Sequence, residues 1–117
     1  MGYELSWESK GLVKRFFGDV TDRQFIDAVI DSESDARFDS LHYVINDFLD
    51  VQSFVFTPDD VDYVAAIDKA AAVSNPHIRI AVVTRNPEII DLSRQYAESP
   101  MNVYPTRRSC SYGQDLI

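Results

Sequence analysis

The sequence predicts a single α/β domain with a mixed, mostly parallel sheet, an amino-terminal antiparallel hairpin and crossover helices. Short apolar runs of β-favouring residues alternate with segments of helical periodicity. The first two runs are joined by a short turn, which is typical of a hairpin. The later runs are separated by helices, the connection that parallel strands require. We expect residues 1–104 to form the domain and 105–117 to be a tail with at most one turn of helix.

Composition excludes several classes of protein. A chain of 117 residues can build one core without disulfides or metal, and the single cysteine, Cys110, excludes an internal disulfide. No apolar run is long enough to cross a bilayer, and no signal peptide is visible, so we expect a cytoplasmic protein with no membrane insertion. The net charge of −8 disfavours nucleic acid as a partner.

The hairpin is predicted from alternation. Residues 3–9 alternate apolar and polar side chains, Gly11 breaks the pattern, and residues 12–17 resume it as a second strand. In that second strand we expect Lys14 and Arg15 to face water. The side chains expected to be buried are Leu12, Val13, Phe16 and Phe17.

Three helices are predicted from their first residues. Thr21 stands three residues before Gln24, a capping-box arrangement. Thr57 precedes Pro58, and Asn86 precedes Pro87, which in each case combines an N-cap residue with proline at the first helical position. The helices are expected to end near Asp31 to Asp35, Ser74 and Ser99.

The remaining strands are predicted from apolar runs. We interpret 41–47 as the central strand, buried on both faces, with Asp47 and Asp50 at its carboxyl end, where open α/β sheets place their binding clefts. A second apolar piece lies at 54–56, another strand at 78–84, and a short final strand at 101–104.

These segments resemble a known family. The sequences GDVTDRQF (18–25), YVINDFLDV (43–51) and AAIDKAAAVSNPHIRIAVVTRNPEI (65–89), followed by YAES (96–99), are similar to small stand-alone bacterial members of the STAS superfamily. That superfamily includes the anti-sigma-factor antagonists, and its smaller group is often described as similar to lipid-carrying CRAL-TRIO domains. The resemblance implies a STAS architecture and a regulatory or ligand-binding role without catalysis.

The phosphorylation turn of the antagonists is altered in this chain. Placing Asp47 on the family's strand aspartate brings residues 55–58 onto an Asp-Ser-Ser-Gly-like turn, whose serine is phosphorylated in relatives. The acid, the serine and the glycine are missing, and only Thr57 keeps a hydroxyl. Thr57 is therefore a possible phosphorylation site by resemblance, and an N-cap by its position. Neighbouring Asp59 and Asp60 would oppose an added phosphate.

The expected binding surface combines the end of the central strand with the start of the next helix. Its residues are Asp47, Asp50, Ser53, Phe54, Phe56, Thr57, Asp59 and Asp60. A protein-binding switch would expose an apolar patch around Phe54 and Phe56. A carrier of a small apolar, lipid-like ligand would instead enclose an apolar cavity of roughly a few hundred cubic ångströms.

Catalysis is the third hypothesis. Asp47 and Asp50 could divide acid and base roles, or could simply hydrogen-bond loop amides. His42 and His77 lack ligands at metal spacing, and no histidine accompanies Cys110, so we expect no metal, no cofactor and no catalytic residue. A homodimer is also possible, through the edge strand that carries Trp7 or through the alanine-rich helix.

Overall fold

The computed structural model describes residues 2–112. The strands are β1 (Gly2–Trp7), β2 (Gly11–Thr21), β3 (Tyr43–Val55), β4 (Arg79–Val83) and β5 (Thr106–Ser109). The helices are α1 (Asp22–Glu33), α2 (Pro58–Ala71) and α3 (Pro87–Glu98), and a 3-10 helix at Ala36–Ser40 precedes β3.

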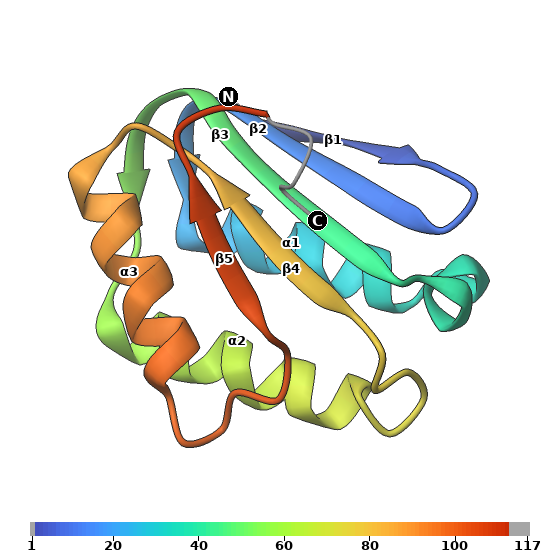
Figure 1. Ribbon diagram of the computed structural model, residues 1–117. Helices are drawn as coiled ribbons and strands as arrows, with labels where there is room; N and C mark the ends of the chain where they lie inside the picture. The colour runs from blue at the N-terminus through green and yellow to red at the C-terminus, as the bar shows by residue number, and fades with distance from the viewer. Residues whose placement is uncertain (1, 113–117) are drawn as a thin grey trace.

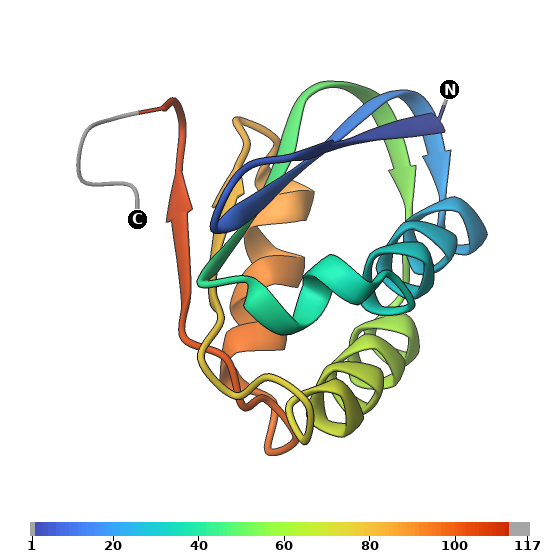
Figure 2. The same ribbon diagram turned by 90° about the vertical axis from the view of Figure 1, so that its right-hand side faces the viewer.

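The strands form one sheet in the order β1-β2-β3-β4-β5 (Figure 1). β1 and β2 are antiparallel, and every other neighbouring pair is parallel. The helices gather on the concave side of the sheet, which curls over them (Figure 2). The predicted class, a mostly parallel mixed sheet with an amino-terminal hairpin and crossover helices, is confirmed.

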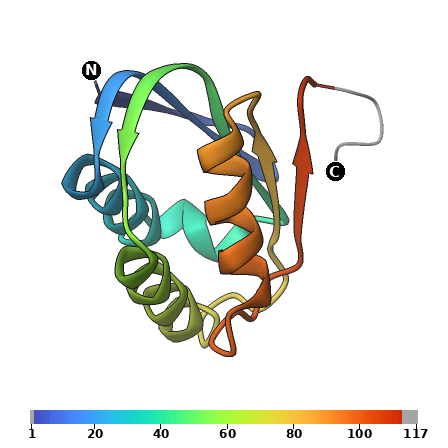
Figure 3. The ribbon, with the colours of Figure 1, turned by 90° about the vertical axis from the view of Figure 1, so that its left-hand side faces the viewer.

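β2 and β3 are long and bent. Their register shifts between Arg15 and Phe17 and again between Gly18 and Asp19, and Gly18 has a φ of 72°, which glycine adopts without a steric penalty. The bend carries the carboxyl ends of both strands down beside the helices (Figure 3). β4 pairs with β3 only as far as Asp47 and Val83, so the rest of β3 pairs with β2 alone.

All three predicted N-caps are present. The Thr21 hydroxyl accepts from the backbone N–H of Gln24, and the Gln24 side chain accepts from the N–H of Thr21. α2 has the same reciprocal capping box, and Asn86 caps α3 by accepting from two backbone N–H groups. These local bonds explain why the helix starts could be predicted to the residue.

Two strand predictions were wrong in position. The central strand predicted at 41–47 is β3, which begins at Tyr43 and continues to Val55, into the apolar piece at 54–56, because β2 pairs with it on both sides of the bend. The final strand is Thr106–Ser109 and not 101–104, because it is Thr106 that pairs with Ile80 of β4. A strand thus lies within the tail predicted to hold at most a helical turn, and residues 113–117 of that tail lie outside the described residues.

The main core fills the space between sheet and helices. Leu12, Phe16 and Val20 of β2 point into it, and so does Lys14, which was predicted to face water. Val13 and Phe17, which were predicted to be buried, are only half-buried. The cause is strict alternation along β2, which places every second side chain on the helix side. A smaller cluster of Ile45, Ala81 and Val83 covers the other face.

Candidate ligand site

Phe54 and Phe56 belong to an aromatic cluster inside the fold. Their rings stack on each other with centroids 5.0 Å apart, and both meet the ring of Phe25 edge-on. Both side chains are half-buried and pack against the main core. The two residues therefore face the interior, whereas a docking patch of the kind expected from the sequence would expose them.

Asp47 and Asp50 are each engaged by partners of their own. Asp47 is buried, and its carboxylate accepts from the Leu49 N–H at 2.9 Å and from the Tyr112 hydroxyl at 2.8 Å. Asp50 is exposed and forms an ion pair of 2.6 Å with Arg15. Because β3 continues to Val55, neither aspartate stands at the end of the strand, and that expectation was wrong.

Ser53 and the start of α2 lie on the surface. The Ser53 hydroxyl donates to Asp19 at 2.8 Å. The exposed Thr57 hydroxyl donates to the Asp60 carboxylate at 3.0 Å and accepts from the Asp60 N–H at 3.2 Å, while Asp59 is exposed. Thr57 is therefore the N-cap of α2, and its phosphorylation stays a prediction.

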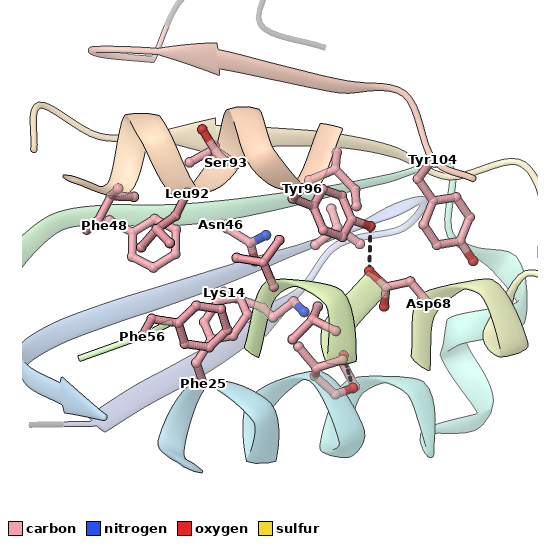
Figure 4. A pocket seen from close by; sticks show the side chains of 18 of the residues that line it. Lys14, Phe25, Asn46, Phe48, Phe56, Asp68, Leu92, Ser93, Tyr96 and Tyr104 are labelled. Atoms are coloured by element: carbon pink, nitrogen blue, oxygen red, sulfur yellow. Dashed lines mark hydrogen bonds between the residues drawn. The ribbon is translucent and has the colours of Figure 1, made fainter. Parts of the chain in front are cut away.

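A cavity of about 80 Å³ lies between the sheet and the three helices (Figure 4). At one end it is lined by Phe25, Phe48, Phe56 and Leu92. Asp68 and Tyr96 stand at the other end, and Lys14 and Asn46 project between the two ends. The space is thus mostly apolar with a compact polar group, the usual composition of a small-molecule site.

The polar group comes from neighbouring strands and from all three helices. Lys14 of β2 and Asn46 of β3 are paired in register, so both side chains point to the helix side, and they are only 6% and 8% exposed. Asp68 of α2 is 7% exposed and accepts from the Tyr96 hydroxyl of α3 at 2.6 Å. Glu33, the last residue of α1, also lines the cavity.

The ionisable members of this group shift one another. Burial raises the pKa of Glu33 to about 9, helped by a hydrogen bond with Asp68 and by the charge of Asp68, although Lys14 acts in the opposite direction. Burial lowers the pKa of Lys14, against the attraction of both carboxylates. Burial and Asp68 raise the pKa of Tyr96. Glu33 therefore keeps its proton at neutral pH.

Asn46 is distinctive among the described residues. Its Oδ1 is the one buried side-chain nitrogen or oxygen within residues 2–112 that has no hydrogen-bond partner. Leaving such a group unpaired costs roughly 1–3 kcal/mol. By contrast, the buried amide of Asn75 bonds at both ends, to the carbonyls of Phe38 and Leu41 and to the N–H of His77. Unpaired buried polar groups are rare, so each one calls for an explanation, such as a ligand, an ion or an ordered water that pairs with it.

These buried polar residues were not predicted from the sequence, although two patterns indicate them. Lys14 alternates with Leu12 and Phe16, which a strict period of two puts on one face of the strand. Asp68 follows Val61 and Val64 by seven and four residues, so it lies on the apolar stripe of α2. In both cases a charged residue at an apolar position of the pattern indicates a buried charge.

Histidines and the cysteine do not join the cavity. His42 and His77 are exposed and border a surface hollow with Tyr43 and Arg79, and Cys110 is exposed. Across residues 2–112 no three His, Cys, Asp or Glu side chains are grouped as a metal ion would require. No helix in the same part of the chain is long and apolar enough to span a membrane.

Comparison with known proteins identifies a solved structure with a similar fold. Neither a family model nor a curated protein sequence matches the chain. Among solved structures, the anti-sigma factor antagonist SpoIIAA in its unphosphorylated form is similar, with a TM-score of 0.63 and 9% sequence identity over 94% of this chain and 90% of that one. The chain therefore has the STAS fold, as its sequence predicted.

Proposed function

We propose that this chain is a non-catalytic STAS-type module that acts by binding a small molecule in the cavity between the sheet and the helices. The observation that carries the proposal is the unpaired amide of Asn46 beside the buried Lys14, inside an otherwise apolar space. Burying both groups without a ligand lowers the stability of the folded protein, and buried polar groups of this kind are retained where they serve binding.

The size of the cavity limits the ligand. A volume of about 80 Å³ is well below the roughly 300–1,000 Å³ typical of sites for drug-sized molecules. It is also below the few hundred cubic ångströms that a lipid carrier would need. The proposed ligand is therefore a compact molecule, and a lipid-like cargo is the weaker alternative.

Titrating small-molecule fragments into the wild type and into a variant with a filled cavity tests the proposal. Leucine at Ser93, a buried residue of the cavity wall, would occupy part of the space, whereas leucine at the exposed neighbour Arg94 would not. We expect small fragments to shift the backbone NMR signals of cavity residues in the wild type and in Arg94→Leu, and to lose this effect in Ser93→Leu. Equal binding by Ser93→Leu would contradict a site in the cavity.

A protein partner is the second candidate function. Val55 is 63% exposed at the end of β3, next to exposed Thr57 and Pro58, and the similar solved structure is that of an anti-sigma factor antagonist. We propose that the exposed part of the predicted surface, at Ser53, Val55, Thr57 and Asp59, docks such a partner in the cytoplasm, with the chain alone or as a homodimer. A photo-crosslinker at Val55 should then capture a protein that one at Val73, 88% exposed on another loop, does not capture.

A further inference from the structure

We infer that the cavity selects an uncharged molecule with a carbonyl beside an N–H donor, that is, a small carboxamide. The inference rests on the proposed function, because it names the ligand class of the same cavity. It follows from three properties of the site: which hydrogen bonds it offers, how many charges it already holds, and how much room it has.

The hydrogen-bonding groups at the cavity are complementary to an amide. Lys14 projects into the space and carries only donors, so it requires an acceptor such as a carbonyl oxygen. Asn46, its neighbour in register, has an acceptor oxygen without a partner, so it requires a donor. That oxygen has almost no accessible surface in the present rotamer, so the amide must turn toward the cavity to accept from a ligand. The two requirements stand side by side on adjacent strands, and a primary carboxamide meets both with its C=O and its N–H. A ketone would meet the first alone.

The charges around the cavity favour a neutral ligand. Lys14 faces two carboxylates, Asp68 and Glu33, and two carboxylates so close together in a buried place do not both ionise beside a single cation. Burial favours the uncharged form of both Glu33 and Lys14, so this space disfavours added charge. A neutral ligand brings none.

A charged ligand would have to exchange protons with the site. A carboxylate would add a negative charge beside two buried carboxyl groups, so it would bind only with uptake of a proton or at a cost in desolvation. An ammonium ion would add a positive charge beside Lys14, so it would bind only if Glu33 released its proton or at a similar cost. The charged classes are therefore disfavoured, and each would reveal itself by a proton taken up or released on binding.

The volume fixes the body of the ligand. The cavity of about 80 Å³ is about half of the roughly 150 Å³ of a cavity that binds benzene or xenon, so it admits a molecule of only a few heavy atoms. The apolar part would lie toward Phe48 and Leu92, away from Asp68. Propionamide has this size and shape.

The test compares propionamide, propionate and propylamine by NMR titration at pH 7, with xenon as an apolar probe that lacks a head group. We expect propionamide to bind at least about tenfold more tightly than either charged analogue, without net proton exchange. The affinity for propionamide should fall about tenfold in Asn46→Leu, because a hydrogen bond to an otherwise unpaired acceptor is lost. Lys14→Met should reduce the preference for the amide to within about threefold, while xenon still binds in both variants.

The alternative results distinguish a wrong ligand class from a wrong proposed function. If propionate or propylamine binds in the cavity as tightly as the amide, the ligand class is wrong while the proposed function stands. If xenon enters the cavity but no analogue does, or if the cavity holds only exchangeable water in place of propionamide, the ligand class again fails. If neither xenon nor any analogue perturbs the cavity residues, the proposed function fails as well.

Discussion

Replacing Asn46 by leucine should stabilise the folded protein. Leucine has nearly the length of asparagine and no polar atoms, so the substitution removes an unpaired buried amide and leaves apolar surface in its place. We expect the free energy of unfolding to rise by about 1–3 kcal/mol, which is the cost of the unpaired group. A gain of this size would raise the melting temperature by roughly 4 °C per kcal/mol in a domain of this length.

Asn75 supplies the matched control. It is also buried, but its side chain donates to the carbonyls of Phe38 at 2.9 Å and Leu41 at 2.8 Å and accepts from the His77 N–H at 3.0 Å. Asn75→Leu removes the partners of these backbone groups. We expect it to lower the free energy of unfolding by about 2–4 kcal/mol.

Urea denaturation of the wild type and both variants measures the difference directly. A changed midpoint with an unchanged slope would report stability alone. The reasoning predicts opposite signs for the two leucine variants. A loss of 1 kcal/mol or more in Asn46→Leu would refute it, because the amide of Asn46 would then be satisfied in the folded protein without a ligand.

Three further substitutions test separate parts of the structure. Because the pKa of Glu33 rises to about 9 on folding, the folded state binds an extra proton above pH 5, and stability falls toward pH 9. In urea titrations, the free energy of unfolding of Glu33→Gln should therefore fall between pH 5 and pH 8 by about 1–2 kcal/mol less than that of the wild type. The same pH dependence in both proteins would contradict the pKa shift. Thr57→Ala should cost about 1 kcal/mol by removing the cap of α2 without affecting propionamide binding, and weaker binding would tie the cap to the cavity. Gly11→Ala would place a Cβ 2.0 Å from the Tyr43 ring and should lower the free energy of unfolding by about 1–3 kcal/mol in urea titrations; an unchanged midpoint would contradict this clash.

Local signals in the sequence explain why so much of the fold could be predicted. The capping residues Thr21, Thr57 and Asn86 form bonds within three residues, so they mark helix starts regardless of what packs around them. The order of strands and helices then follows from the apolar runs between these caps, and right-handed crossovers leave few topologies.

The strand ends and the ligand site depend on contacts distant in sequence. β3 continues to Val55 because β2 bends with it through two register shifts, and β5 begins at Thr106 because Ile80 lies opposite. Neither pairing leaves a mark on the local sequence. The cavity likewise brings together Lys14, Glu33 and Asp68 from three elements. Each of these residues, considered alone in the sequence, is expected at the surface.

The central claim, a small molecule bound in the cavity, is tested most directly by intermolecular NMR contacts in protein saturated with propionamide. The account predicts nuclear Overhauser effects from the ligand methyl group to Phe48 and Leu92, and from the ligand amide to the Asn46 side chain. Contacts only with surface residues such as Val55 and Thr57, or no contacts at saturation, would contradict it.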